Sequence, residues 1–261
     1  MASQDVQLQH TQVSAAGTID PSHIGTLLDA LGRKINLAPH TFVTRETTLG
    51  RNDDQSAHAL ETSDSQWSNV RRAREHSRIT VRTEANETSL VLLLPPTPPG
   101  QHPHVLVRSM ILVHDLTPTT KTYTTEPLEG VAIFGAPLES ISKLAIHHAG
   151  WSELTHLLNW TPADEQLVYG LRYVLHSDDP LVLNELRVYC TASCELQGDP
   201  PVMHPRHVFH VRAMSSFRSD SGPGVPKVKQ DKASLALQYA IQHMEQLSKS
   251  LETIVPLHRD I

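Results

Sequence analysis

The stretch that decides the fold is LVYGLRYVLH at residues 167–176, followed by the turn SDDP at 177–180 and the run LVLNELRVYC at 181–190. Both runs are rich in residues that favour strands, and a short polar turn that ends in proline separates them, which predicts a β-hairpin. Because side chains alternate along a strand, Tyr169, Leu171 and Tyr173 are expected on one face, with Val168 and Val174 on the other.

Both faces of this predicted hairpin are largely apolar. In an antiparallel strand with one solvent-exposed face, apolar residues alternate with polar ones. A sheet that is apolar on both faces must therefore have both faces covered, one by the core and the other by a helix or a partner. We expect Val188 on the core face and Leu171 on the partner face, and alternation alone leaves the order of the two faces open. The candidate partner contacts are Tyr169, Leu171, Tyr173, Leu183 and Tyr189.

Composition favours one domain with polar insertions. The chain has 261 residues, 39% of them hydrophobic, with 18 prolines that gather in a few stretches. We therefore expect a single β-barrel domain over 1–261, with polar insertions at about 50–66 and 95–103. A net charge of −6 argues against a general nucleic-acid binder, whose domain is normally basic.

The two cysteines and the N-terminal sequence point to a soluble intracellular protein, cytoplasmic or nuclear. Cys190 and Cys194 are too few for a disulfide framework, and buried free thiols are the ordinary state for such a pair. No apolar run approaches the roughly 20 residues of a membrane span. Residues 1–17 lack the charged-then-apolar pattern of a signal peptide.

Helices are expected at both ends of a series of strands. Asp20 as N-cap and Pro21 at the first helical position begin the first helix, whose apolar stripe runs from Ile24 to Ile35. A last helix is predicted at 233–254, with an apolar seam that packs on the chain's own barrel or, alternatively, on a partner. Glycine and proline at 222–226 predict a mobile linker over 215–232. The other strand-like runs, at 42–49, 78–84, 89–94, 105–113, 121–125, 131–134 and 207–217, favour a barrel or sandwich.

The residues that could carry chemistry do not form a recognisable site. Three of the 17 histidines, His204, His207 and His210, recur every third residue, which sends successive side chains to opposite faces of a strand. There is no Gly-x-Ser-x-Gly elbow and no glycine-rich phosphate loop. The arginine cluster at 71–78 could meet phosphate or an acidic partner, and a solvated face is favoured because the whole chain is acidic.

Paired carboxylates are also missing. A barrel that performs metal-dependent phosphate chemistry needs carboxylate side chains that point into its interior and hold a divalent ion. On a strand, Glu-x-Glu places two such side chains on the same face. No two acidic residues in this chain are separated by one position; Glu84 and Glu87 are three apart, and Glu185 stands alone in its strand. We therefore expect no catalytic residues, no metal and no cofactor.

The order of several short segments resembles the Mediator subunit 18 family of RNA polymerase II transcription. The segments are Thr41-Phe42, 106–109, 154–158 leading into 169–173, and the ending 242–260 with Pro256-Leu257. The resemblance implies a mainly β (α+β) fold, a many-stranded antiparallel β-barrel flanked by helices and related to the RNA triphosphatase tunnel fold without its activity. It also implies a nuclear coactivator subunit of the head module that forms a heterodimer with Mediator subunit 20, binds a helix of Mediator subunit 8, and meets RNA polymerase II indirectly.

Three functions compete at this level. The leading one is a non-enzymatic barrel that docks partners, because the hairpin is apolar on both faces and acid pairs are missing. The alternative is a metal-dependent triphosphate-tunnel phosphohydrolase, in which Glu84 or Glu185 would matter for turnover. A third is a barrel that binds a small apolar ligand, which needs a roomy lumen.

Overall fold

The computed structural model describes residues 7–34, 38–51, 78–84, 87–93, 98, 101–113, 122–123, 144–145, 160–195, 202–219 and 227–259. A nine-stranded sheet dominates it. Its strands are β1 (Gln7–Ile19), β2 (His40–Arg51), β3 (Arg78–Glu84), β4 (Glu87–Leu93), β5 (Leu106–Val113), β8 (Trp160–Leu175), β9 (Val182–Glu195), β10 (Val202–Arg218) and β11 (His258–Arg259). A separate two-stranded sheet pairs β6 (Thr122–Tyr123) with β7 (Leu144–Ala145).

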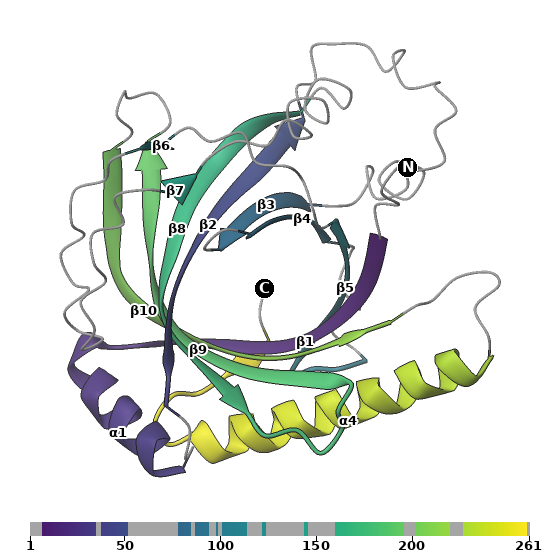
Figure 1. The fold of residues 1–261 in the computed structure, drawn as a ribbon. Helices are drawn as coiled ribbons and strands as arrows, with labels where there is room; N and C mark the ends of the chain where they lie inside the picture. Colours follow the sequence, from purple (N-terminus) through teal and green to yellow (C-terminus); the bar gives the residue numbers. More distant parts are fainter. Residues whose placement is uncertain are drawn as a thin grey trace, which may run out of the picture.

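The large sheet closes into an antiparallel barrel. Its strand order is β10-β9-β8-β2-β3-β4-β5-β1-β11, and β10 also pairs with β1, so the two ends of the sheet meet (Figure 1). Closure leaves the main strands without a free edge. The predicted mainly β fold with an antiparallel barrel and flanking helices is confirmed, and the hairpin of β8 and β9 is one part of its wall.

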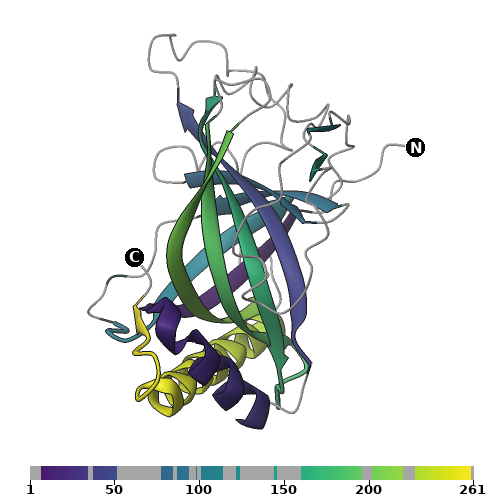
Figure 2. The same cartoon turned by 90° about the vertical axis from the view of Figure 1, so that its left-hand side faces the viewer.

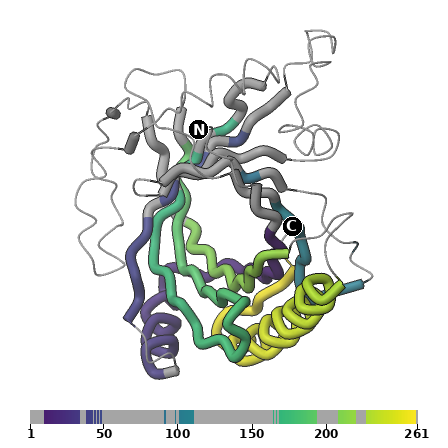
Figure 3. Tube along the Cα trace, turned by 45° about the vertical axis from the view of Figure 1, so that its right-hand side comes forward, coloured from purple at the N-terminus to yellow at the C-terminus, as the bar shows by residue number. Residues whose placement is uncertain are grey.

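Two helices cover the barrel from outside. The 3-10 turn η1 (Pro21–His23) leads into α1 (Ile24–Lys34), and α4 (Lys227–Leu251) packs on β10 and β1. Figures 1 and 2 show both helices beneath the ring of strands, and Figure 3 shows the ring from a third direction. The predicted N-cap is confirmed: the Ser22 N–H donates to Asp20 Oδ1 at 2.8 Å, and hydrogen bonds from Ser22 lower the pKa of Asp20.

The main core lies between the outer wall of the barrel and these helices. Its members alternate along β1, β8, β9 and β10, and α1 and α4 supply the opposing side chains, such as Leu27, Leu31 and Met244. A smaller cluster of Phe42, Val168 and Tyr189 lies on the inner face of the wall. The barrel wall is therefore apolar toward the helices and mixed toward the inside.

The predicted linker over 215–232 is wrong at both ends. Strand β10 continues to Arg218 because Ser215 and Phe217 are buried, and the Ser215 hydroxyl donates to Asn184 Oδ1 at 2.6 Å. Helix α4 begins at Lys227, where good helix formers follow the glycine and proline run, and it ends at Leu251 rather than at 254. Residues 220–226 lie outside the described part.

The insertions predicted at 50–66 and 95–103 also lie mostly outside the described residues. Gly50 and Arg51 end strand β2, and of the second segment the structure describes residue 98 and 101–103. The strand-like run at 131–134 is not described. Within the described ranges, no helix combines the length and the apolar character needed to cross a bilayer.

Candidate functional site

Three of the five predicted partner contacts lie in the protein's own core. Tyr169, Leu171 and Tyr173 are only 2%, 5% and 3% exposed, and burial raises the pKa of both tyrosines. All three belong to the cluster that the helices cover. The chain's own helices therefore cover this face of the hairpin. The prediction that Tyr169, Leu171 and Tyr173 contact a partner is wrong.

The other two candidates have different environments. Tyr189 is 8% exposed and lies on the inner face, where its ring stacks on His210 with centroids 5.3 Å apart. Leu183 is 48% exposed near the start of β9. Of the five predicted residues, only Leu183 is open to a partner on this structure.

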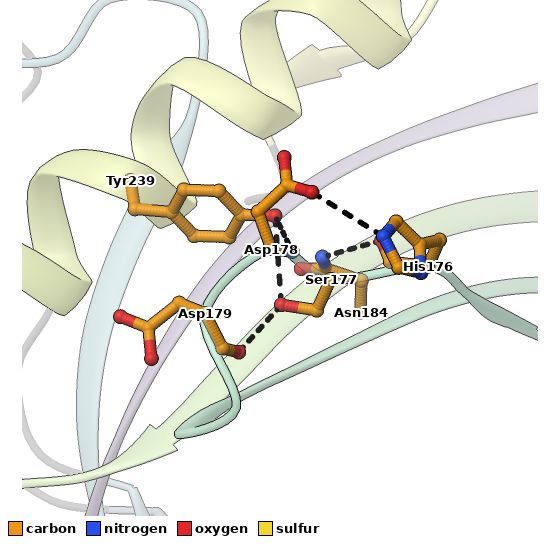
Figure 4. A network of polar contacts seen from close by, with 6 residues as sticks. All are labelled: His176, Ser177, Asp178, Asp179, Asn184 and Tyr239. Carbon is orange, nitrogen blue, oxygen red and sulfur yellow. Dashed lines mark hydrogen bonds and ion pairs between the residues drawn. The ribbon is translucent and has the colours of Figure 1, made fainter.

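The end of the hairpin is fixed to helix α4 by polar contacts (Figure 4). The Asp178 N–H donates to Tyr239 Oη at 2.9 Å, and the Ser177 hydroxyl lies 3.5 Å from the same oxygen. Within the turn, the Ser177 hydroxyl donates to the Asp179 carbonyl at 2.7 Å, and the Asn184 side-chain amide donates to the His176 carbonyl at 3.2 Å. These bonds hold the turn in one conformation against the helix.

Exposed apolar side chains lie on the same two elements. The hairpin end carries Leu181 at 58% and Leu183 at 48% exposure, and α4 carries Val228 at 66% and Leu235 at 64%. A spacing of seven residues places Val228 and Leu235 on one helix face. We call these four side chains the exposed apolar set. Such side chains suit contact with another protein better than contact with water.

On the inner face of the same wall, three arginines stand side by side. Arg172 of β8 is the register partner of Arg187 of β9, and Arg187 is the register partner of Arg212 of β10. Each alternates with core residues such as Leu171, Val188 and Val211, so the arginines lie on the face opposite the helices. Neighbouring strands are about 4.8 Å apart, which places the three positions in one compact row.

One carboxylate and one aromatic ring fix part of this row. Arg187 donates to Glu185 Oε2 from Nη2 at 2.9 Å and from Nε at 3.3 Å, while Arg172 Nε lies 3.9 Å from Glu185 Oε1. The Arg187 guanidinium also lies over the Phe42 ring, 5.1 Å from its centroid. Arg172 and Arg212 take part in further interactions. The exposed fractions of the Arg172, Arg187 and Glu185 side chains are 29%, 15% and 11%, so water reaches the row.

Sequence reasoning missed this arginine row. Arg172 is visible as the charged residue on an apolar face of the hairpin, and Glu185-x-Arg187 places two opposite charges on one face of the next strand. Arg212 could be added only from the register of β10 against β9. The arginine cluster at 71–78, which sequence singled out, lies outside the described residues except for Arg78 at the start of β3.

Cys190 and the acidic residues of β3 and β4 bear on nucleophile and metal chemistry. Burial raises the pKa of Cys190 to about 11, so this free thiol is protonated at neutral pH and is a poor nucleophile. Within the ranges that the structure covers, no three His, Cys, Asp or Glu side chains are grouped to hold a metal ion. Glu84 and Glu87 are register partners at the adjoining ends of β3 and β4.

No protein-family model and no curated protein matches the sequence. Among solved structures, the chain is similar to one chain of the Schizosaccharomyces pombe Mediator head module, with a TM-score of 0.54 and 9% identity over 96% of this chain and 98% of that chain. It also matches the S. pombe Pct1 RNA triphosphatase in complex with the Spt5 CTD (TM-score 0.37, 7% identity, 97% and 88% covered) and the PH1819 protein from Pyrococcus horikoshii (0.37, 10%, 89% and 89%). At this identity the first likeness shows a shared fold, and the TM-scores of the other two are too low to support an argument.

Proposed function

We propose that the chain is a non-enzymatic, partner-binding subunit of a Mediator head module, acting in nuclear RNA polymerase II transcription. The observation that supports this function is the shared fold with a chain of the S. pombe head module, which extends over nearly the full length of both chains. The order of short segments in the sequence, which resembles the subunit 18 family, points the same way. The partners we propose are Mediator subunit 20, as a heterodimer, and a helix of Mediator subunit 8.

The exposed apolar set gives this proposal a candidate surface. Leu181 lies in a turn that α4 holds in place through Tyr239, and Val228 and Leu235 are exposed on that helix. Leu183 follows at the start of β9, on the same face of the wall as Glu185. A surface that is rigid before binding loses little conformational entropy on association. The buried centre of a protein interface is more apolar than the rest of the surface and is depleted of charged residues.

Co-purification tests the proposed assembly. The tagged full chain, expressed in cells of its own source, should bring down subunits 20 and 8 of the head module, identified by mass. The double variant Leu181→Asp/Leu183→Asp should lose them while its thermal melt stays unchanged, because both side chains are exposed. Thr26→Asp, on the exposed side of α1, is the matched control. Retention of head-module subunits by the double variant would reject this surface, and their absence from the wild-type eluate would reject the proposed assembly.

The alternative, a metal-dependent triphosphate-tunnel phosphohydrolase, retains one supporting observation. Glu84 and Glu87 stand opposite each other in the β3–β4 ladder, while Glu185 is engaged by Arg187 and Arg172. A titration of Mg²⁺ and Mn²⁺ with a nucleoside triphosphate separates the two functions. We expect phosphate release no faster than buffer. Release that follows the protein through purification and falls in Glu84→Ala or Glu185→Ala would establish the enzyme instead.

A further inference from the structure

Helix α4 begins with a segment that buries no side chain. All residues from 227 to 232 are exposed, and the first buried side chain of the helix is Ala236. In Figure 1 these first turns, at the right, extend beyond the strands that the rest of α4 covers. A helix end without buried contacts opens at a low free energy, so this segment can leave the helix while the core stays intact.

The residue types of this segment do not favour the start of a helix. Acidic side chains stabilise a helix N-terminus, yet the first turn of α4 has none and carries Lys227 and Lys229. Val228, between the two lysines, is 66% exposed. Cations at the positive end of a helix and an apolar side chain in water are both mildly unfavourable. These residues therefore have a role other than starting the helix.

Val228, Lys229 and Asp231 form a pattern of an apolar residue, a lysine, any residue and an acid. Enzymes that conjugate a small ubiquitin-like modifier read this pattern directly in an extended segment. The apolar side chain packs beside the reactive cysteine, and the acid pairs with basic groups of the enzyme. No other lysine in the sequence has both an apolar residue directly before it and an acid two positions after it. All three side chains are exposed, as such recognition requires.

The acceptor lysine is within reach of an enzyme. Lys229 takes part in an interaction of its own, but contacts between exposed side chains contribute little to stability, so an enzyme can replace this one. Lys232 is also exposed and lies in the next turn. It follows an acid instead of an apolar residue and has Ser234 two positions after it, so it lacks both recognition elements and is a matched comparison.

We propose that Lys229 is an attachment site for a small ubiquitin-like modifier. The modifier arrives as a thioester that joins its C-terminal glycine to the cysteine of the conjugating enzyme, formed by an activating enzyme as ATP is cleaved to AMP and pyrophosphate. Lys229 Nζ attacks the thioester carbonyl carbon. The C–N bond of an isopeptide forms, the C–S bond breaks, and the cysteine is released as a thiol with the proton that the amine gives up. The proposal concerns the free chain and does not depend on the function proposed above.

Conjugation in a purified system tests the site. The full chain is incubated with the activating enzyme, the conjugating enzyme, the modifier and ATP, without a ligase. The products are separated on a gel, and the modified residue is located by mass spectrometry. The modifier should be attached to Lys229. A reference substrate that carries the same pattern shows that the enzymes are active. No conjugate under conditions that modify the reference substrate, or attachment mainly to another lysine, would overturn the proposal.

Substitutions separate recognition of the pattern from simple exposure of a lysine. Lys229→Arg should abolish conjugation, because it keeps the positive charge and removes the nucleophilic amine. Lys232→Arg makes the same change in the next turn and should leave the rate unchanged. Asp231→Asn keeps the size of the side chain and removes the charge that the enzyme reads, so the initial rate should fall about tenfold.

Circular dichroism and thermal melts establish that each variant is folded, as expected for substitutions at exposed positions. Conjugation of Lys229→Arg at the wild-type rate would overturn the proposal. So would a wild-type rate in Asp231→Asn, or equal losses in Lys232→Arg and Lys229→Arg, because the enzyme would then be responding to exposed lysines in general.

Discussion

Leu171 of β8 and Val188 of β9 stand directly opposite each other in the barrel wall, and both side chains lie in the core between the wall and the helices. Leu171 is 5% exposed and Val188 is fully buried. The two residues therefore share one face of the hairpin. The sequence-based expectation had placed Val188 on the core face and Leu171 on a partner face, and the register shows that this division is wrong.

Leu171→Asp and Val188→Asp should therefore both unfold the protein. Each would place a carboxylate among apolar side chains with no cation designed to pair with it, at a cost of several kcal/mol. The total stability of a domain is only about 5–15 kcal/mol, so such a loss is severe. The measurement is a thermal melt followed by circular dichroism, in which both variants should lose their cooperative transition or melt far below the wild type.

Leu181→Asp is the matched control for these two variants. Its side chain is 58% exposed on the same hairpin, so a charge there stays in water and should change stability by no more than about 0.5 kcal/mol. A Leu171→Asp protein that melts like Leu181→Asp would show that the wall does not bury Leu171 in solution.

Gly170 is required by the close approach of β8 and β9. A Cβ added at this position would overlap the carbonyl oxygen of Val188 and lie 2.6 Å from Tyr189 Cα. Both obstacles include backbone, which cannot move aside without breaking the ladder. Gly170→Ala should therefore destabilise the protein by roughly 1–3 kcal/mol, through local overpacking, in chemical denaturation.

Gly25 in α1 offers the opposite case. An added Cβ there meets nothing within 4 Å. Because alanine loses less backbone entropy than glycine in a helix, Gly25→Ala should stabilise by about 0.5–1 kcal/mol. Shifts of the same sign in the two variants would contradict the packing described around Gly170.

The hairpin and the first helix could be predicted because their signals are local. Strand-favouring residues at 167–176 and 181–190 around the turn at 177–180 predicted the hairpin. Asp20 with Pro21 predicted the start of the helical segment formed by η1 and α1. These signals come from neighbouring residues. Local signals fail where long-range pairing decides. Phe217 ends the strand-like run at 207–217 and also falls inside the predicted linker at 215–232. In the barrel it lies opposite Thr11 and Val182 and is buried, so it belongs to the strand.

Long-range strand pairing also limits what the sequence could predict about candidate sites. Tyr169, Leu171 and Tyr173 were recognised as needing a cover, and only the folded arrangement shows that the chain's own core supplies it. Arg172 and Arg212 are 40 positions apart in the sequence and become near neighbours through β9, a relation that depends on register. The residue types in the sequence predicted apolar or charged contacts, and the strand pairing determined which residues make them.

His243 should make the protein less stable in mild acid. Burial lowers the pKa of His243 from its ordinary value of 6.5, although the charge of Asp178 acts in the opposite direction. The unfolded chain therefore takes up a proton at a higher pH than the folded chain. Stability should be complete above about pH 6.5 and fall as the pH drops toward the folded-state pKa, below which the effect levels off.

The check is the melting temperature between pH 8 and pH 5 for the wild type and for His243→Phe. Phenylalanine keeps a ring against Tyr239, whose centroid lies 6.0 Å from that of His243, and removes the titration. The variant should show a smaller decline below pH 6.5. His104→Gln, at an exposed position before β5, should follow the wild-type curve. Parallel curves for the wild type and His243→Phe would mean that His243 is not the responsible group.

Tyr239→Phe tests whether the bond between hairpin and helix prepares the exposed apolar set for a partner. The variant loses the oxygen that accepts from the Asp178 N–H at 2.9 Å and keeps the ring that packs on the core cluster. Because water replaces the lost acceptor at this exposed turn, stability should fall by no more than about 1 kcal/mol. Amide hydrogen exchange at Asp178 should nevertheless become faster, and binding to head-module partners should weaken several-fold, because the turn that carries Leu181 and leads into β9 must then be ordered during association. Faster exchange with unchanged binding would separate the turn from the interface, and unchanged exchange would show that the Tyr239 hydroxyl does not hold the turn.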